Sequence, residues 1–177
     1  DDSNPFFSFD NVACVSCARC VRACDEIQGT HALTMFGRGF EARPAAGPYQ
    51  PSAISHQPFA LGFADSNCVS CGACVKECPT GALTEKTVQK QGAPTGTVRT
   101  TCAYCGVGCS FDAGVRDGRV VRMTPADDGP SNQGHACMKG RFGWTYNDAP
   151  DRLRVPLLRR GNDWEEISWE SALDRVA

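Results

Sequence analysis

A chain of 177 residues can form one or two domains, each with a modest core. Its formal net charge of −2 and mean hydropathy of −0.32 argue against a basic nucleic-acid-binding protein and against an intrinsically disordered one. No apolar run approaches the roughly 18 residues of a membrane span, and no N-terminal signal pattern is present. We therefore expect neither nucleic acid nor membrane as a partner.

Residues 1–90 are predicted to form one domain built from short elements. Residues 5–10 alternate as a strand does, and residues 20–28 suit a short helix that ends near Gly29. Residues 32–40 are predicted to be extended. The proline-rich stretch between residues 40 and 59 is predicted to be a surface loop, more readily a tolerated insertion than a partner-docking loop.

The second half of this domain is expected to repeat strand, cysteine loop, short helix and strand through about residue 88. A stretch rich in Gly, Pro and Gln follows over residues 89–96, and we place the linker at 91–96. A domain of this size with so few large apolar side chains needs a covalent or metal staple to be stable.

The twelve cysteines supply that staple, because they form three sets of four with none left over. Cysteines three apart on a tight loop aim their sulfurs at one point, which favours metal binding over a disulfide scaffold. Zinc would be satisfied by paired C-x2-C knuckles. The first two sets instead have the C-x2-C-x2-C-x3-C spacing of bacterial two-cluster ferredoxins, in which the fourth cysteine ligates the other cluster.

An internal repeat supports crossed ligation. The run Cys14-Val-Ser-Cys aligns with Cys68-Val-Ser-Cys at an offset of 54, and Ala32-Leu-Thr recurs as Ala82-Leu-Thr at an offset of 50. Two copies imply pseudo-two-fold symmetry, so the fourth cysteine of each half is assigned to the cluster of the other half. The predicted [4Fe–4S] ligand sets are Cys14, Cys17, Cys20 and Cys78 for cluster 1, and Cys68, Cys71, Cys74 and Cys24 for cluster 2. One departure is that Pro79 follows Cys78 whereas Asp25 follows Cys24.

Residues 97–153 are predicted to hold a third [4Fe–4S] cluster in a small, mostly β domain. Residues 97–101 suit a strand, and residues 110–116 and 119–123 flank Asp117-Gly118, a strong hairpin signal. The last cysteine, Cys137, is separated from Cys109 by 27 residues and lies in a glycine-rich basic turn. The predicted ligands of cluster 3 are Cys102, Cys105, Cys109 and Cys137.

The end of the chain reads as the start of another domain. Residues 154–158 suit a strand, and Ser168 is a good N-cap for a helix over 169–177. The apolar pattern of that helix is still running at the last residue, and the chain begins with Asp1 rather than Met. We therefore expect a truncated chain, with residues 154–177 opening a larger domain.

The third cysteine set carries a resemblance. The run Thr101-Cys-Ala-Tyr-Cys-Gly-Val-Gly-Cys109, with Asn132-Gln-Gly-His-Ala-Cys137-Met-Lys139-Gly-Arg141, resembles the N-terminal iron–sulfur domain of molybdenum or tungsten bis-pterin oxidoreductases. With the two-cluster domain before it, the chain resembles the N-terminal iron–sulfur portion of the α subunit of NAD-dependent formate dehydrogenases. The fold class so predicted is α+β, a ferredoxin-like domain followed by a [4Fe–4S] domain of the molybdopterin oxidoreductase type.

The resemblance implies a function in electron transfer. Electrons from formate oxidation to CO2, or for the reverse reaction, would pass between a Mo or W bis-(molybdopterin guanine dinucleotide) centre in the parent chain and a partner. That partner is a β subunit with FMN, an NAD site and a cluster, and a small [2Fe–2S] γ subunit is a further candidate. The resemblance gives Lys139 a place between cluster 3 and the pterin, implies a cytoplasmic enzyme, and places the catalytic residues outside this sequence.

Other roles stay open at this point. Related candidates are a nitrate reductase, the large subunit of NADH:quinone oxidoreductase and an iron-only hydrogenase, although the third set does not fit the active site of the last. A zinc-binding interaction module is the alternative from another class. Arg141 could serve a phosphate or a pterin, or lie at the surface. Three cations beside the cysteine loops are expected to offset cluster charge, namely Arg19, Arg22 and Lys76. The three histidines, His31, His56 and His135, match no ligand pattern.

Overall fold

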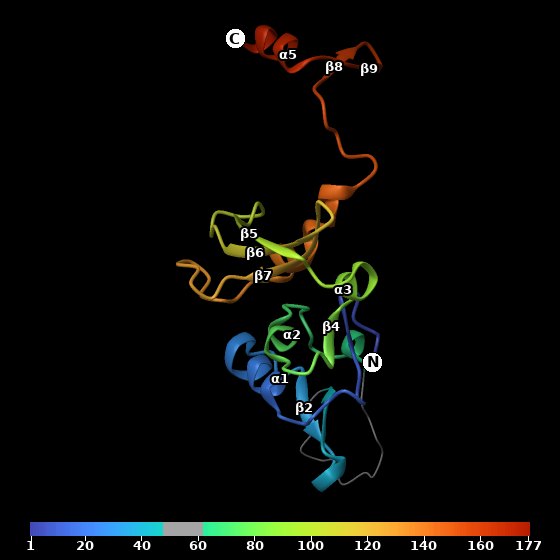
Figure 1. The fold of residues 1–177 in the computed structure, drawn as a ribbon, viewed down its shortest axis with the longest axis vertical. Helices are drawn as coiled ribbons and strands as arrows, with labels where there is room; N and C mark the ends of the chain where they lie inside the picture. Colours follow the sequence, from blue (N-terminus) through green and yellow to red (C-terminus); the bar gives the residue numbers. More distant parts are fainter. Residues whose placement is uncertain (48–61) are drawn as a thin grey trace. The chain divides into compact units, whose positions relative to one another are not determined.

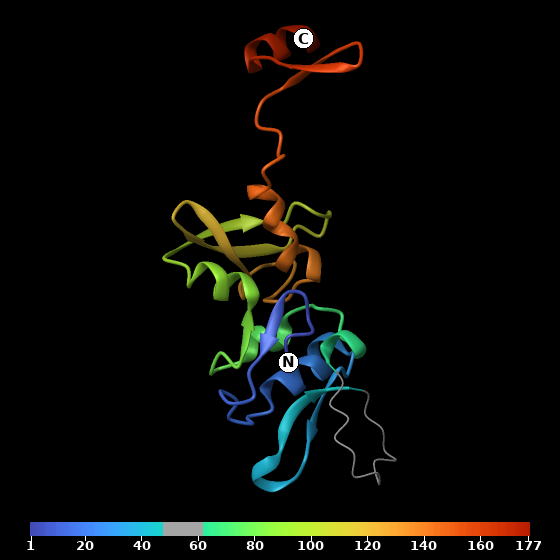
Figure 2. The same cartoon turned by 90° about the vertical axis from the view of Figure 1, so that its right-hand side faces the viewer.

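The computed structural model describes residues 1–47 and 62–177. These residues form two compact units, Asp1–Trp144 and Thr145–Ala177, and each is described by itself (Figures 1 and 2). The first unit contains all twelve cysteines, so it holds every predicted cluster ligand.

A two-stranded sheet joins the beginning of the chain to the residues after the second cysteine set. Strand β1 (Phe7–Phe9) runs antiparallel to β4 (Leu83–Glu85), with Phe9 opposite Leu83. The alternation predicted for residues 5–10 is confirmed, because Phe7 and Phe9 are buried on one face while Ser8 is half-buried. This pairing of distant segments brings the two halves of the repeat together.

Two short helices carry cysteines out of their loops and contact each other (Figure 1). Helix α1 (Arg19–Arg22) continues into the π-helical turn η1 (Ala23–Gln28), which ends at Gly29 with a φ of 72°. The helix predicted for residues 20–28 is thus present, with its second part wound as a π-helix. Helix α2 (Ala73–Glu77) is its counterpart in the second half.

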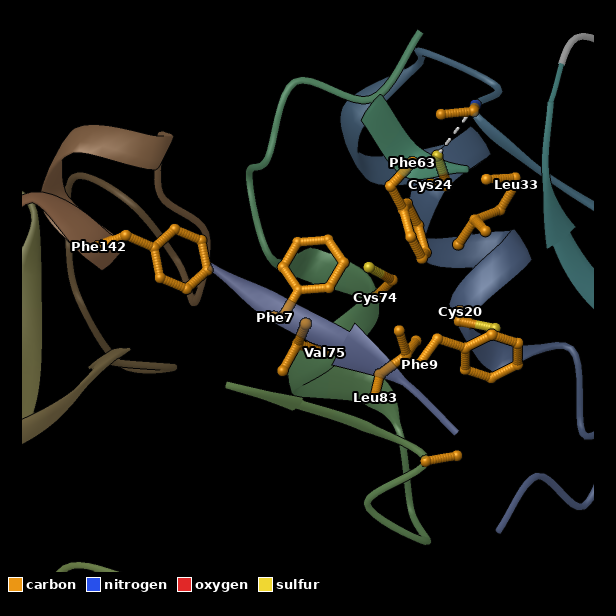
Figure 3. Packing of buried hydrophobic residues seen from close by; sticks show 13 residues of the cluster. Phe7, Phe9, Cys20, Cys24, Leu33, Phe63, Cys74, Val75, Leu83 and Phe142 are labelled. Carbon is orange, nitrogen blue, oxygen red and sulfur yellow. Dashed lines mark hydrogen bonds between the residues drawn. The ribbon is translucent and has the colours of Figure 1, made fainter. Parts of the chain in front are cut away.

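Aromatic rings and cysteine side chains share the core of the first unit. The ring of Phe7 is fully buried and meets the ring of Phe63 edge-on at 5.0 Å between centroids. Figure 3 shows Cys20, Cys24 and Cys74 among these aromatic and aliphatic side chains. Three of the cysteines predicted to bind clusters are therefore part of the hydrophobic core.

Residues 32–47 depart from the predicted extended segment and loop. Strand β2 (Leu33–Phe36) stops at Phe36 and, after the 3-10 turn η2 (Gly39–Glu41), pairs with β3 (Arg43–Ala46). The loop prediction is therefore wrong for residues 43–46, where Pro44 sits on a two-stranded ribbon that tolerates a missing backbone donor. The rest of that predicted loop, from residue 48, lies outside the described residues.

The second half also departs from a strict repeat. Where a strand was expected before the second cysteine set, the described residues form the 3-10 turn η3 (Phe63–Asp65), which allows Phe63 to reach Phe7. After β4 the chain forms helix α3 (Lys86–Gln91) instead of continuing as a strand, in keeping with its long unbranched side chains. The 1–90, 91–96, 97–153 and 154–177 boundaries remain a prediction.

The third cysteine set lies on segments that join or follow the strands of a three-stranded antiparallel sheet, whose order is β5-β6-β7 (Figure 2). The predicted hairpin is confirmed, since Asp117 and Gly118 both have positive φ, as a type I′ turn needs. The strands are followed by helix α4 and the 3-10 segment η4. The bounds of these elements are β5 (Gly96–Thr101), β6 (Ser110–Arg116), β7 (Arg119–Pro125), α4 (Met138–Phe142) and η4 (Gly143–Asp148).

The second unit is a hairpin followed by a helix. Strand β8 (Leu157–Arg160) pairs with β9 (Asp163–Glu166), a strand that the sequence analysis missed. Helix α5 (Trp169–Val176) begins as predicted, with the Ser168 hydroxyl accepting a hydrogen bond from the Ser171 amide at 3.1 Å. No helix in the described part of either unit is long and apolar enough to cross a bilayer.

The buried ring of Phe7 gives a test of the core. We expect Phe7→Ala to lower the free energy of unfolding by about 3–5 kcal/mol, because the cavity it leaves adds to the lost burial. The matched control is Phe40→Ala, whose ring is fully exposed and whose loss should change stability by less than about 0.5 kcal/mol. Anaerobic urea unfolding of the intact protein measures both, and equal effects would contradict the described core.

Candidate metal centres

The first candidate centre is a small hollow, about 10 Å³ in volume, whose lining joins the two halves of the repeat. Its four sulfur-bearing residues are those predicted for cluster 1, namely Cys14, Cys17, Cys20 and Cys78. Cys14 and Cys17 come from the loop before α1, Cys20 comes from α1 itself, and Cys78 is the residue after α2. Their ligation of a metal cluster remains a prediction, but the fold does bring them together.

The second candidate centre mirrors the first. A small hollow, about 10 Å³ in volume, is lined by the residues predicted for cluster 2, which are Cys24, Cys68, Cys71 and Cys74. Here the crossing residue is Cys24, carried on η1 out of the first half. The crossed arrangement expected from the repeat is therefore the one that the β1–β4 pairing and the α1–α2 contact produce.

Matching backbone conformations shape the two cysteine loops. Ser16 and Ser70, related by the repeat, both have φ of 54°, and the amide of each donates to the sulfur two residues before it at 3.4 Å. Two residues further, Ala18 has φ of 58° and Gly72 has φ of 75°. These left-handed residues curl each loop around its hollow and direct amide donors to the sulfurs.

Cys24 and Cys78, the cysteines that each half contributes to the centre of the other half, receive similar hydrogen bonds. The Ala32 amide donates to the Cys24 sulfur at 3.3 Å, and the Leu83 amide donates to the Cys78 sulfur at 3.4 Å. Each sulfur also has a threonine hydroxyl within reach, Thr30 for Cys24 and Thr80 for Cys78. Hydrogen bonds of this kind favour the thiolate, which is the form that ligates iron.

Burial opposes ionisation at four of these thiols, Cys20, Cys68, Cys71 and Cys74. It raises the pKa of Cys20 to about 11 and raises the pKa of Cys74 well above its ordinary value. Burial also raises the pKa of Cys78, but hydrogen bonds from Leu83, Thr80 and Ala82 outweigh it, so the net pKa is lowered. Several thiolates packed together in an apolar core need a positive centre among them, which an iron–sulfur core supplies. The donor set therefore fits that group.

The third candidate centre comprises the residues predicted for cluster 3. Cys109 interacts electrostatically with Cys102, Cys105 and Cys137, and this proximity raises its pKa after the larger effect of burial. The Cys102 amide donates to the Cys109 carbonyl at 2.8 Å, which closes the loop between β5 and β6. Within the described residues, no three His, Cys, Asp or Glu side chains gather closely enough to hold a single ion. In the first two centres, where cavities are defined, the sulfurs surround a hollow.

Asn132, which the sequence analysis did not single out beyond its motif, connects the two parts of this third centre. Its Oδ1 accepts from the Ser110 amide at 2.8 Å, and its Nδ2 donates to the Ser110 carbonyl at 3.2 Å and to the His135 carbonyl at 2.8 Å. The first two bonds fix the residue after Cys109, and the third fixes the turn two residues before Cys137. One side chain thus holds the last ligand against the other three.

Asn4 has a similar role at the second centre and was missed. It is 2% exposed, and its Nδ2 donates to the Ser70 hydroxyl at 2.9 Å and contacts the Cys68 sulfur at 3.8 Å. Its Oδ1 accepts from the Phe6 amide at 2.9 Å. A polar residue just before an apolar strand gave no sequence signal for this role.

The cations predicted beside the cysteine loops are mostly engaged by carboxylates. Arg19 pairs with Glu77 at 3.1 Å on the surface, and Lys76 pairs with Asp127 and donates to the Gly134 carbonyl at 2.9 Å. The guanidinium of Arg22 has no hydrogen bond or ion pair with any described residue. Their predicted effect on cluster charge stays untested.

Lys139 lies on α4, two residues after Cys137, and its side chain is exposed. Its ammonium makes no hydrogen bond or ion pair with another residue in the described ranges. His31 pairs with Asp25 at 3.0 Å, His135 is exposed, and His56 lies outside the described residues. The predicted role of Lys139 between cluster 3 and a pterin stays a prediction.

A surface position was one of the roles left open for Arg141, and the structure excludes it. It is 1% exposed, and its guanidinium donates to the carboxylate of Glu85, also buried, at 2.9 Å. Arg122 donates to the same carboxylate oxygen at 3.3 Å. Burial lowers the pKa of Arg141, and Glu85 opposes this, so the guanidinium remains charged. Glu85 follows the buried Leu83 by two residues, so the two-residue alternation of strand β4 predicts that the Glu85 side chain is also buried. This pattern is the sequence signal for Glu85.

A cleft of about 360 Å³ separates the second and third centres within the first unit. Its lining includes one ligand candidate from each, Cys71 and Cys137, together with Arg141, Lys76 and His135. The two centres therefore face a common space.

Comparison with known proteins agrees with this arrangement. Residues 13–82 match the family model of a 4Fe-4S dicluster domain, and residues 95–148 match that of the molybdopterin oxidoreductase Fe4S4 domain. The chain therefore carries a ferredoxin-like dicluster domain followed by an Fe4S4 domain of the molybdopterin oxidoreductase type.

Relatives extend the similarity over the whole chain. A Bacillus subtilis protein named "Probable oxidoreductase YjgC" is 30% identical over 217 residues. Two proteins named "Putative formate dehydrogenase", from Staphylococcus haemolyticus and Staphylococcus aureus, are 28% and 27% identical over 216 residues. These alignments cover 99–100% of this chain but only 21% of each relative. The chain thus spans about a fifth of their length.

The Asn132 contacts predict a selective defect. Asn132→Ala should deprive the intact protein of cluster 3, about four iron and four sulfide per chain, while the other two clusters remain. Ser131→Ala is the matched control, because the neighbouring hydroxyl makes one exposed bond to the Gly108 carbonyl and should leave the iron content unchanged. Iron and acid-labile sulfide analysis measures both, and full iron content in Asn132→Ala would contradict the role of this side chain.

Proposed function

We propose that this chain is the electron-transfer portion of a formate dehydrogenase that couples formate oxidation to CO2, or its reverse, to NAD. The observation that carries the proposal is the fold's assembly of twelve cysteines into two crossed four-sulfur hollows and a third set beside Lys139. The match of residues 95–148 to a molybdopterin oxidoreductase domain supports it, as do the names of the Staphylococcus relatives.

When bound, the three [4Fe–4S] clusters would supply one-electron carriers, with a Mo or W bis-(molybdopterin guanine dinucleotide) centre elsewhere in the parent protein. The chain's own residues would do the positioning. The cysteine loops hold the sulfurs, amides such as those of Ser16 and Ser70 donate to them, and the Phe7 core keeps water from the first two centres.

Lys139 would act at the end of the route toward the pterin. An exposed ammonium two residues after the last ligand of the third centre lowers the free energy of negative charge on groups placed either side of it. The cleft lined by Cys71 and Cys137 supports passage between the third and second centres. From the crossed pair, electrons would go to a β subunit with FMN, an NAD site and a cluster, and a small [2Fe–2S] γ subunit is proposed as a further partner.

We propose a cytoplasmic location for this enzyme. The proposed coupling to NAD supports that compartment.

Metal analysis of the anaerobically purified parent protein tests the proposal first. The expected result is at least about twelve iron and twelve sulfide per chain, with molybdenum or tungsten in the same sample and bleaching of the brown colour by formate. Zinc at about three per chain without sulfide would overturn the electron-transfer function and favour a zinc-binding module. Clusters that bleach with dithionite but never with formate would reject formate as the substrate.

Lys139 provides a second test. Lys139→Ala should slow formate-dependent reduction of the clusters about tenfold, or about 1.4 kcal/mol, because an ammonium beside the route is lost. Lys139→Arg should restore part of the rate. The control is Lys90→Ala, which removes an equally exposed ammonium at the end of α3. Stopped-flow absorbance measures the rates, and equal effects of Lys139→Ala and Lys90→Ala would contradict the special role of position 139.

A further inference from the structure

A buried charge cluster lies where the dicluster part of the first unit meets the third cysteine segment. Arg141 from α4 and Glu85 from β4 are each about 1% exposed and are joined at 2.9 Å, while Arg122 from β7 reaches the same carboxylate at 3.3 Å. Next to this pair, the ring of Phe142 stacks on that of Phe6 with centroids 4.8 Å apart. The two buried members, Arg141 and Glu85, carry opposite charges, and the half-buried Arg122, whose side chain is 33% exposed, adds a second positive charge at the edge of the group.

Arg141 is also placed against the cysteine loop of the second centre. It interacts electrostatically with Cys71 and Cys74. A Cβ added at Gly72 would lie 2.4 Å from the Arg141 Nε and 2.5 Å from its Cδ, so only glycine allows the side chain to lie where it does. The loop and the guanidinium are therefore in direct contact.

The Nε of Arg141 has no hydrogen-bond partner among the described residues, although it is fully buried. A buried donor without a partner is costly, so such groups mark places where a further ligand completes the site. Here the neighbouring residues are ligand candidates for an anionic cluster. An unpaired cationic donor beside them has the chemistry that such a group requires.

The other half of the repeat lacks this feature. The counterpart of Gly72 is Ala18, which adopts the same left-handed backbone, with φ of 58°. The cation nearest in sequence to it is Arg19, whose side chain is 52% exposed and paired with Glu77. Among the described residues, Arg141 is the one arginine or lysine that is fully buried. The two centres have similar ligands but different electrostatic surroundings.

We propose that Arg141, held by Glu85 against Gly72, is a positioning residue that makes cluster 2 easier to reduce than cluster 1. A buried positive charge stabilises the additional electron on the cluster beside it more than a solvated one does. Helix α4 begins next to Cys137 and ends with Arg141 and Phe142, so it connects the third centre to the guanidinium that acts on cluster 2. Cluster 2 then becomes the preferred electron acceptor across the cleft shared by Cys71 and Cys137.

This inference rests on the proposed cluster binding, and reduction potentials test it separately. The parent protein is titrated anaerobically with dithionite, each cluster takes up one electron, and EPR reports its reduced form. Cys17→Ser and Cys71→Ser, each altering one cluster, assign the signals. In Arg141→Gln we expect the equilibrium constant for reduction of cluster 2 to fall about tenfold, which is about 59 mV for one electron, with cluster 1 unchanged. Glu85→Gln should shift cluster 2 in the opposite direction.

Two backbone variants test placement without removing a charge. Gly72→Ala should displace the guanidinium and lower the potential of cluster 2, because the new Cβ would overlap Arg141. Ala18→Gly is the matched control at the equivalent left-handed position and should leave both potentials unchanged. Arg141→Lys keeps the charge and should retain part of the wild-type potential. These variants carry the test if Arg141→Gln does not assemble its clusters.

The outcomes separate the two proposals. Wild-type protein without iron and sulfide would reject the proposed function itself. Fully assembled clusters whose potentials are unchanged in Arg141→Gln, or in Gly72→Ala where Arg141→Gln does not assemble, would overturn this inference while leaving the proposed function intact. Equal shifts of both clusters would also overturn it, since the effect would then be a general one on the fold.

Discussion

Cysteine thiols buried in the core are the constraint on which the dicluster part of this protein depends. Cys20, Cys24 and Cys74 occupy core positions beside Phe7 and Phe63, where a chain of ordinary composition would place aliphatic side chains. Burial raises the pKa of Cys20 and of Cys74, so their thiolates are costly without a positive partner. The core is thus completed by what the sulfurs bind, which ties stability to cluster assembly.

The crossed arrangement follows from one short strand pair. Because β1 pairs with β4, the beginning of the first half lies against the end of the second, and the helices after each cysteine loop contact one another. The fourth cysteine of each half then lies beside the first three of the other. Each hollow is therefore lined by cysteines from both halves of the repeat.

The junction with the third segment uses a different interaction. The Arg141–Glu85 pair and the Phe6–Phe142 stack connect α4 to β4 and to the residue before β1. Breaking such a buried pair costs about 3–5 kcal/mol when one partner is left behind. The same pair that fixes the third segment against the dicluster part therefore also controls the charge next to the second centre, so packing and electrostatics are coupled at that point.

Local chemistry allowed the sequence by itself to determine the three cysteine sets, the repeat, the Asp117-Gly118 hairpin and the Ser168 cap. Each depends on residues close in the chain or on a fixed spacing. The loop predicted for residues 43–46 is wrong, because these residues form strand β3, and strand β9 was not predicted. A short strand is stabilised by its partner more than by its own propensity. Only the tertiary structure decided that Arg141 is buried on Glu85, that Asn132 and Asn4 secure ligand loops, and that Cys71 and Cys137 line one cleft. These contacts join residues tens of positions apart, and no local pattern encodes them.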